Sequence, residues 1–553
     1  NNNNNDNDND NNNDNNNNNN YNTAQPANEI YRKKNNRKAT YKEKKILGEI
    51  EIKAKRKFKS KDELAIVKEI WLDKLRLLMV KLKQHKEREK RIKNNSLFSK
   101  EEANFYRKEC KNKESTIGNT PNIESFEEFW GEIWEDESRT PNTRWMEKVM
   151  CKIKEKVRVV NQFEISEEVL GQIIKKRKNW SAAGIDGIAN FWWKKFKVTW
   201  KPLANAMKLW IEEPKRIPVW ITLGRTVLIP KTQDLTLAKD YRPITCLNTS
   251  YKIFTATLAK YVKNHVVENE IWDENQMGTC ENVLGTVDQL IIDNAIMGEV
   301  KDYHRNLAVA YYDYQKAYDM VHHDWMLRVY DWMGIPEKIC KVIKKLMNGW
   351  KTRLEVKTNK EVLLSRWINI KKGFLQGDTY SPIGFCLTEI PVMMMLQETD
   401  GYKMGLPGDR QLKRTHSLFI DDLKTYQENH VKLELANNIL VQASLDTGAL
   451  YGVKKCAEIT FERGKMVKGN GLQIMGERIE ALNPENNEIY KFLGCEQAAG
   501  SDMTRILVRV ESEMRKRMIA ITEMSLYDKN MIKAINCRVI QVARMYVDIR
   551  ISC

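Results

Sequence analysis

The pair Asp421–Asp422 constrains the fold of this chain more than any other feature of the sequence. The two acids stand between the apolar runs 417–420 (Ser-Leu-Phe-Ile) and 423–426 (Leu-Lys-Thr-Tyr), and both runs have the character of short β-strands. We therefore predict a tight hairpin in which the two acids themselves join the strands. Such a loop ordinarily holds Asn-Gly or Asp-Gly, and adjacent carboxylates repel each other unless a cation compensates. The pair is therefore either part of a metal site or an exposed acidic turn.

A third acid, Asp313, favours the metal site. It follows the apolar run 307–312, which also reads as a strand. A carboxylate at a strand end beside a carboxylate hairpin offers the hard oxygen ligands that Mg²⁺ prefers. Two such ions, roughly 3.5–4 Å apart, can activate a hydroxyl group and stabilise a leaving pyrophosphate.

Composition points to a folded protein with a polyanionic partner. The chain has 553 residues, 42% of them hydrophobic, and its 92 Lys and Arg against 74 Asp and Glu give a formal charge of +18. This excess favours a nucleic acid as partner over a merely soluble basic protein. The sequence shows no signal peptide and no long uncharged apolar stretch, and its 10 cysteines form no CxxC pair. It therefore predicts no membrane partner and no zinc site, and a location in the nucleus or cytoplasm.

The chain changes character along its length. The tract 1–22 is Asn with a few Asp and has nothing to bury, so we predict disorder there. A basic stretch follows, and a capping box at Ser60 opens a long amphipathic helix that ends near Lys93. A short helix is expected around residues 126–134. From about residue 163 helices alternate with strands, such as those expected at 225–229, 307–311 and 417–420, and two helices are expected at 503–524 and 529–548. The chain begins with Asn and stops at Cys553, so we expect both ends to continue in a longer protein.

Several motifs, in order, resemble those of reverse transcriptases, and most closely the polymerases of non-LTR (LINE-type) retrotransposons. Residues 312–319 (Tyr-Asp-Tyr-Gln-Lys-Ala-Tyr-Asp) are similar to motif A, residues 373–382 (Gly-Phe-Leu-Gln-Gly-Asp-Thr-Tyr-Ser-Pro) to motif B and residues 419–422 (Phe-Ile-Asp-Asp) to motif C. Flanking matches lie at 179–188, 228–231, 241–244, 275–278, 288–290, 452–456 and 490–494. The resemblance covers about residues 120–550, and it departs from the family at Ile420, where Ala or Met is more common.

The resemblance implies a role for each matched residue. The catalytic and metal-binding group is Asp313, Asp421 and Asp422, with two Mg²⁺ ions and Mn²⁺ as an alternative. Lys455 is implied to protonate the leaving pyrophosphate, with Lys454 as its rival. The nucleotide-binding residues are Lys231 and Arg242 for the triphosphate, Tyr318 as a gate against the 2′-hydroxyl, and Gln376 and Gly377 along the nascent base pair. Tyr490, Leu493 and Gly494 are implied to form the primer grip.

The implied fold is α+β, a right-hand polymerase with fingers and palm, a partial helical thumb and a basic helical N-terminal extension. We assign residues 1–22 to the disordered tract, 23–115 to the extension, 116–200 to a linker with the N-terminal motif, 201–497 to fingers and palm, and 498–553 to the thumb. The implied function is RNA-directed DNA polymerisation on an RNA template, with dNTPs and a DNA primer or nicked target DNA.

Two alternatives stay open. One is a related polymerase, such as a group II intron maturase or a viral RNA polymerase. The other is a catalytically lapsed remnant that only binds RNA. No zinc knuckle and no endonuclease motif is recognisable, so we expect polymerisation without nicking of intact DNA.

Overall fold

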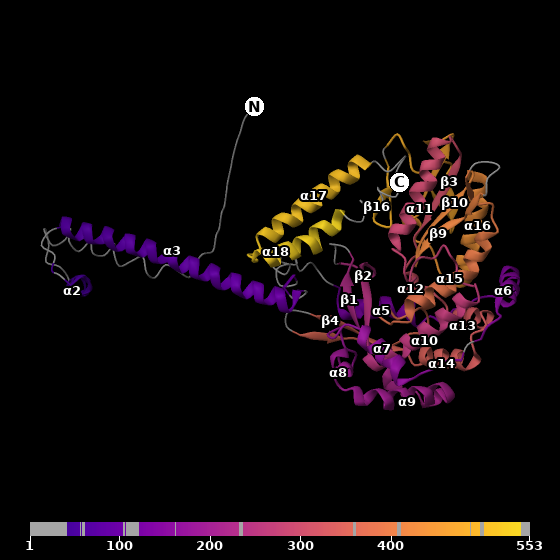
Figure 1. The fold of residues 1–553 in the computed structure, drawn as a ribbon, viewed down its shortest axis with the longest axis horizontal. Helices are drawn as coiled ribbons and strands as arrows, with labels where there is room; N and C mark the ends of the chain where they lie inside the picture. The colour runs from indigo at the N-terminus through magenta and orange to yellow at the C-terminus, as the bar shows by residue number, and fades with distance from the viewer. Residues whose placement is uncertain are drawn as a thin grey trace. The chain divides into compact units, whose positions relative to one another are not determined.

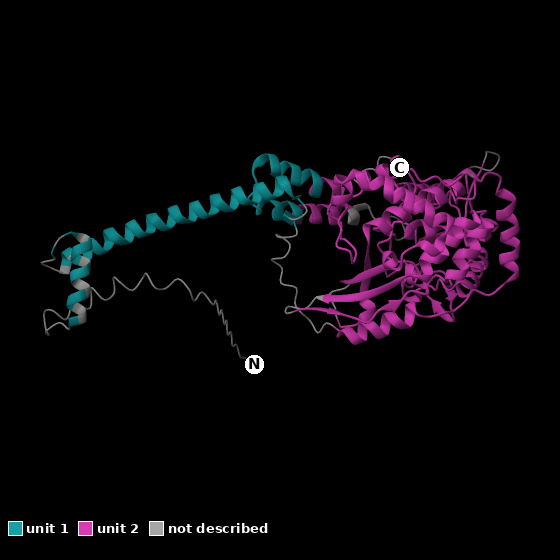
Figure 2. Cartoon of the chain, turned by 90° about the horizontal axis from the view of Figure 1, so that it is seen from below, with its two compact units in different colours: residues 1–113, 517–538 teal, residues 114–516, 539–553 magenta. Residues whose placement is uncertain are grey.

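The computed structural model describes most of the chain as two compact units. The described residues are 41–55, 57, 61–102, 105–106, 121–160, 162–231, 236–357, 361–405, 411–486, 488–497 and 503–543. The smaller unit comprises residues 1–113 and 517–538, and the larger comprises 114–516 and 539–553 (Figure 2). The tract 1–22 and the predicted helix start at Ser60 lie outside the described residues. No described helix is long and apolar enough to span a membrane.

The smaller unit is helical. It contains α2 (Tyr41–Ala54), α3 (Lys61–Lys100) and α18 (Asp528–Ile535). The predicted long helix is confirmed as α3, which continues past Lys93 to Lys100. The Asn94 side chain donates to the carbonyl of Met524 at 3.0 Å, and Asn95 Oδ1 accepts from the backbone N–H of Tyr527 at 2.7 Å. Two asparagines near the end of α3 therefore hold the segment that leads into α18.

The larger unit is built around a five-stranded sheet in the order β12-β11-β3-β10-β9, of which Figure 1 labels β3, β10 and β9. Its strands are β3 (Leu307–Tyr312), β9 (His416–Phe419), β10 (Asp422–Gln427), β11 (Ala457–Glu462) and β12 (Lys465–Val467). All six residues of β3 are buried, which accounts for its uniformly apolar sequence. Helices α15 (Ser381–Gln397) and α16 (His430–Thr447) share a core with Ala308 and Ala310, whereas α11 (Thr286–Asp302) shares one with Val309.

A second sheet in this unit has the order β2-β1-β4-β5, with β6 also paired to β4. Its strands are β1 (Leu223–Pro230), β2 (Tyr241–Leu247), β4 (Lys351–Lys357), β5 (Val362–Leu364) and β6 (Ile368–Asn369). The larger unit also contains helices α6 (Arg144–Lys156), α7 (Glu167–Lys176), α8 (Asn190–Lys195), α9 (Trp200–Glu212), α10 (Thr249–Glu268), α12 (Ala317–Met320), α13 (His323–Trp332) and α14 (Glu337–Asn348). The unit has three further hairpins: β7 (Tyr402–Met404) with β8 (Leu412–Arg414), β13 (Leu472–Ile474) with β14 (Glu477–Ile479), and β15 (Tyr490–Phe492) with β16 (Cys495–Gln497). Helix α17 (Met503–Thr522) begins in this unit, and its residues from 517 onward are grouped with the smaller unit.

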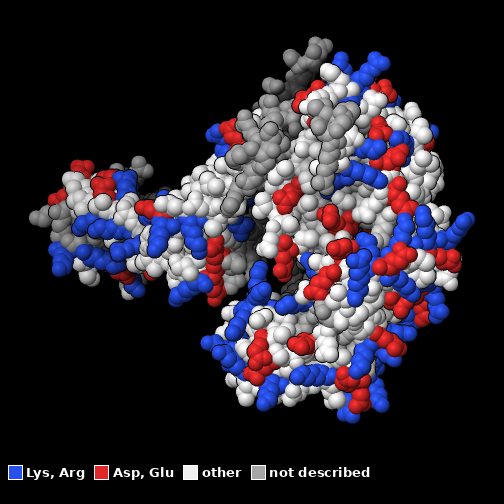
Figure 3. All heavy atoms as spheres, turned by 45° about the vertical axis from the view of Figure 1, so that its right-hand side comes forward, with Lys and Arg blue, Asp and Glu red and all other residues white. Residues whose placement is uncertain are grey.

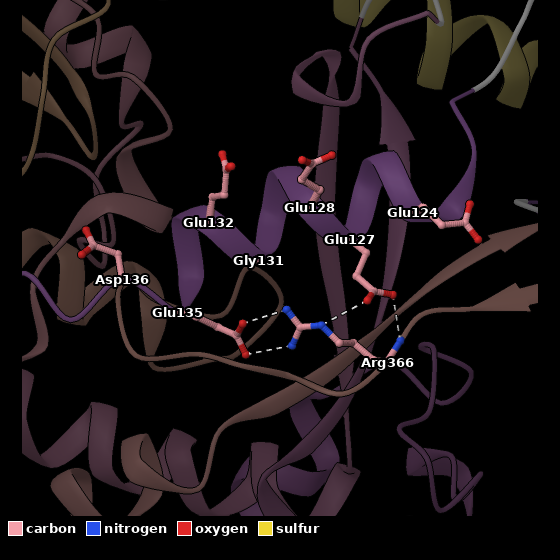
Figure 4. Close-up of a pocket in the computed structure, with 8 residues that line it drawn as sticks. All are labelled: Glu124, Glu127, Glu128, Gly131, Glu132, Glu135, Asp136 and Arg366. Atoms are coloured by element: carbon pink, nitrogen blue, oxygen red, sulfur yellow. Dashed lines mark hydrogen bonds and ion pairs between the residues drawn. The ribbon is translucent and has the colours of Figure 1, made fainter.

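Helix α5 (Ile123–Trp134) is the short helix predicted around residues 126–134. Its apolar residues Phe126, Trp130 and Trp134 are buried, as the spacing predicts. Figure 4 shows Glu127 turned toward Arg366, with Glu128 and Glu132 pointing away from it. Arg366 reaches back from the second sheet and pairs with Glu135 at 2.8 Å and Glu127 at 3.1 Å. The Arg366 guanidinium holds the pKa of Glu135 down at about 2. These ion pairs fix the C-terminal end of α5, where the Trp134 side chain contacts Asp319.

The predicted strands around residues 225–229, 307–311 and 417–420 are confirmed as β1, β3 and β9. The predicted loop between β9 and β10 was wrong by one residue. Phe419 pairs with Asp422, so the two loop residues are Ile420 and Asp421, and Asp422 already belongs to β10. The reason is that Ile420 takes a left-handed conformation, with φ +58°, and turns the chain one position earlier than the acids suggest.

Candidate active site

The three predicted acids meet at one end of the central sheet. Strands β3 and β10 are antiparallel, and Leu423 pairs with Tyr312. One residue further along, Asp422 and Asp313 therefore lie at the same end of the sheet. Asp421 lies in the adjoining turn. Antiparallel pairing thus brings together acids that lie about a hundred residues apart in the chain.

The carboxylates influence one another electrostatically. Loss of solvation by burial, followed by the charges of Asp421 and Asp313, raises the pKa of Asp422 to about 6 although part of its surface meets solvent. Burial, with a contribution from Asp313, also raises the pKa of Asp421. Crowded like charges of this kind are stabilised by a cation, and such perturbed carboxyl groups are typical of functional sites.

Lys455 pairs with one of the acids, and two further cationic side chains, Arg242 and Lys231, lie within electrostatic range of this group. Lys455, in a short 3₁₀ turn, donates from Nζ to Asp313 Oδ2 at 2.9 Å. Arg242 lies on β2 opposite Ile229, and Lys231 follows the end of β1. Partial burial first, and then the charges of Arg242 and Lys455, lower the pKa of Lys231. Arg242 and Lys231, at the end of the second sheet, therefore add positive charge near the carboxylates, suited to binding phosphate groups.

The donor set suits a hard divalent cation, because it consists of carboxylate oxygens alone. Within the described ranges, no three His, Cys, Asp or Glu side chains stand close enough together, as they lie, to hold a metal ion. The Lys455 ammonium pairs with Asp313 in this structure.

Tyr318 lies close to this edge. Its ring stacks on Phe385 with centroids 5.2 Å apart and an interplanar angle of 20°. Burial, then Cys386 and Asp421, raises the pKa of the Tyr318 hydroxyl, which places the ring within the electrostatic range of the acids. Stacking on Phe385 supports a fixed ring orientation.

Asp319, the next residue, is a part of the site that the sequence reasoning did not assign. Its side chain is 2% exposed and accepts hydrogen bonds from Gln376 Nε2 at 2.8 Å and Trp134 Nε1 at 3.0 Å. Burial raises its pKa to about 6. Asp319 thereby fixes the side chain of Gln376. In the sequence, only the position of Asp319 directly after Tyr318 indicated that it belongs to the site.

Gly377 is required by a close backbone approach. Its φ is +117°, and a Cβ at this position would stand 2.4 Å from the carbonyl oxygen of Thr245 on β2. The preceding residue, Gln376, accepts from the Thr245 N–H at 2.7 Å. Glycine therefore lets the segment of residues 376–377 lie directly against β2, which is a reason for this residue that the sequence did not reveal.

The predicted primer-grip residues form the hairpin of β15 and β16. Leu493 and Gly494 make its turn, with φ of +47° and +85°. Tyr490 stacks on Tyr311 of β3 with centroids 4.2 Å apart, and its hydroxyl donates to the carbonyl of Lys455 at 2.9 Å. The hairpin is therefore anchored beside the acidic edge.

Carboxylates at adjoining strand ends, opposed by lysine and arginine on a second sheet, are typical of enzymes that transfer phosphoryl or nucleotidyl groups. The family described as reverse transcriptase (RNA-dependent DNA polymerase) matches residues 229–497, which contain every predicted site residue. Residues 229–497 therefore match a reverse transcriptase domain.

Three similar proteins support this assignment. The Pol polyprotein of the type-1 retrotransposable element R2 from Nasonia vitripennis is 26% identical over 57% of this chain and 29% of that protein. The type-2 element R2DM polyprotein of Drosophila melanogaster is 27% identical over 46% of this chain and 22% of that protein. The type-1 R2 polyprotein of Popillia japonica is 28% identical over 39% and 29%, respectively. The matched region is less than a third of each relative's length.

Proposed function

We propose that this chain is an RNA-directed DNA polymerase that transfers nucleotides from dNTPs to the 3′-hydroxyl of a primer on an RNA template. The observation that carries the proposal is the convergence of Asp313, Asp421 and Asp422 at one sheet edge, opposite Lys231 and Arg242, inside a reverse transcriptase domain. The arrangement matches what a growing DNA end and a triphosphate need. Negative oxygen ligands lie on one side and fixed positive charge on the other.

In this proposal Asp313 and Asp421 hold the divalent cations, and Asp422 is a third, supporting carboxylate. Two Mg²⁺ ions, when bound, activate the 3′-hydroxyl and neutralise the leaving pyrophosphate. Lys231 and Arg242 bind the triphosphate, Arg242 by a forked contact. Lys455, released from Asp313, protonates the pyrophosphate.

The neighbouring residues orient the other reactants. Tyr318 lies beneath the sugar of the incoming nucleotide, and Gln376 and Gly377 lie along the nascent base pair. Tyr490, Leu493 and Gly494 hold the primer strand. Residues 201–497, which belong to the larger unit, correspond to fingers and palm, and residues 498–553 to a partial thumb, of which residues 517–538 are grouped with the smaller unit. The partners are an RNA template and a DNA primer or nicked target DNA, with action in the nucleus or cytoplasm.

The experiment is primer extension on a primed RNA with dNTPs and Mg²⁺. Asp313→Ala and Asp421→Ala should each abolish extension while RNA binding and the thermal melting profile are retained, because each removes a metal ligand. Asp302→Ala, an exposed aspartate at the end of α11, is the matched control and should extend like the wild type. Extension near the wild-type rate by either site variant would locate the metal centre elsewhere.

The same assay separates the two alternatives. Wild-type protein that binds RNA but extends no primer would identify a lapsed RNA-binding remnant. A panel of RNA and DNA templates with dNTPs and rNTPs distinguishes a reverse transcriptase, including the maturase type, from an RNA polymerase. Efficient rNTP incorporation by the wild type would contradict the proposed function.

A further inference from the structure

The turn that presents the acidic pair is held in an unfavourable conformation. Ile420 has φ +58°, a left-handed conformation that β-branched residues rarely adopt. A two-residue hairpin loop with positive φ at its first position ordinarily has glycine there. Because Asp421 follows Ile420 directly, any relaxation of this residue redirects the carboxylate. The surrounding structure must therefore hold the turn.

The side chain of Gln276 makes three hydrogen bonds that do so. Its Oε1 accepts from the backbone N–H of Ile420 at 2.8 Å and from that of Gly278 at 2.8 Å. Its Nε2 donates to the carbonyl oxygen of Ile420 at 3.2 Å. Two N–H groups need an acceptor and one carbonyl needs a donor, and a side-chain amide supplies both. Gln276 therefore binds both polar backbone groups of the residue that precedes the acidic pair.

Gln276 is itself rigidly placed. It is 2% exposed, and its segment runs beside β9, where Leu418 donates to the carbonyl of Asn275 at 3.1 Å and accepts from Met277 N–H at 3.0 Å. Gln289 of α11, also buried, donates to the carbonyls of Asn275 at 2.6 Å and Leu418 at 3.1 Å. The segment therefore covers the free edge of β9 and carries Gln276 to the turn at a fixed distance.

Gly278 completes the arrangement. A Cβ on this residue would stand 2.5 Å from Ile420 Cγ1 and 2.8 Å from the Ile420 nitrogen. Glycine thus allows the two backbones to approach closely enough for the Gln276 amide to reach both Ile420 groups. Gln276 and Gly278 therefore act together at the turn: Gln276 binds the backbone of Ile420, and Gly278 leaves room for it.

We propose that Gln276 is a positioning residue, which holds the left-handed peptide of Ile420 and so sets the direction of the Asp421 and Asp422 carboxylates for cation binding. This inference rests on the proposed function, in which those carboxylates hold divalent cations. Gln276 acts through the backbone and touches no reactant. Replacing Gln276 should weaken cation binding more than it weakens the affinity for template or nucleotide.

The test compares Gln276→Met with Gln427→Met. Gln427 is a matched control, because it is fully buried, lies at the far end of β10 and also uses both ends of its amide, accepting from Gly401 N–H at 3.0 Å and donating to Thr399 at 2.7 Å. Mn²⁺ binding is measured by electron paramagnetic resonance without nucleotide or template. Gln276→Met should weaken Mn²⁺ binding about 10- to 100-fold, the range typical of lost supporting contacts at metal sites, and Gln427→Met should leave it unchanged.

A second variant tests the mechanism. Ile420→Gly removes the conformational penalty, so adding it to Gln276→Met should recover part of the lost Mn²⁺ affinity. In extension assays, Gln276→Met should shift the Mg²⁺ requirement upward while KM for dNTP at saturating Mg²⁺ stays the same. If Gln276→Met fails to fold, Gln276→Asn takes its place, because it keeps the amide but is one methylene too short to reach both Ile420 groups.

Each outcome decides one claim. Mn²⁺ affinity of Gln276→Met equal to that of the wild type would overturn the positioning role. Equal losses in Gln276→Met and Gln427→Met would overturn it as well, because they would reflect general loss of buried hydrogen bonds. Wild-type protein that neither binds Mn²⁺ nor extends a primer would instead overturn the proposed function.

Discussion

Asp319 should make the stability of the larger unit depend on pH in an unusual direction. Its carboxyl group is buried beneath the site, where Trp134 of α5 and Gln376 donate to it and Lys231 and Lys316 contribute positive charge. Burial outweighs these favourable contacts and raises the pKa from 3.8 to about 6. Between these two values the folded protein keeps a proton that the unfolded chain has released.

The sign and magnitude follow from linkage. A group that holds its proton more tightly in the folded state makes the free energy of unfolding fall as pH rises. The fall begins near pH 4 and is complete somewhat above pH 6. A shift of about two pKa units corresponds to about 3 kcal/mol at 1.36 kcal/mol per unit, so ionised Asp319 costs the folded state about that much at pH 7.

Asp319→Asn removes the titrating group and keeps a side chain of the same shape. We expect the free energy of unfolding of the variant, relative to wild type, to rise by about 3 kcal/mol between pH 4 and pH 7. Urea unfolding, followed by tryptophan fluorescence at several pH values, measures the difference, and Asp302→Asn controls for the loss of one charge. A wild-type-to-variant difference that stays constant across this range would show that the pKa of Asp319 is not raised in the folded protein.

Two further outcomes are expected. Tyr318→Ala should admit ribonucleotides, because it removes the ring that is proposed to exclude the 2′-hydroxyl. Tyr318→Phe should keep the wild-type dNTP-to-rNTP selectivity. An unchanged dNTP-to-rNTP selectivity in Tyr318→Ala would mean that Tyr318 only packs against Phe385. Affinity for single-stranded RNA should fall steeply with salt, with a slope of log affinity on log salt of about −0.7 per neutralised phosphate. Figure 3 shows basic and acidic side chains intermixed on the face it draws of the larger unit, so a flat salt response would mean that the formal charge of +18 forms no phosphate-binding surface.

Local patterns in the sequence determined the elements of this fold and the residue types of its site. Apolar runs of strand length predicted β1, β3 and β9, and helical spacing predicted α3 and α5, because burial of one face or of a whole strand dictates those periods. The acids at 313, 421 and 422 could be singled out because carboxylates at strand ends carry an electrostatic cost that calls for a cation. Hydrophobic pattern and charge are properties that neighbouring residues display without knowledge of the rest of the chain.

Only the tertiary structure decided which distant residues support the site. Asp319 looks like one acid among 74 until α5 brings Trp134 onto it, and Gln276 looks like a polar loop residue until its amide meets Ile420. The hairpin turn also fell one residue earlier than predicted, since the left-handed Ile420 is stabilised by Gln276 from another segment. Hydrogen bonds between segments far apart in sequence leave no periodic trace. Their partners become known only when the packing of the chain sets the distances.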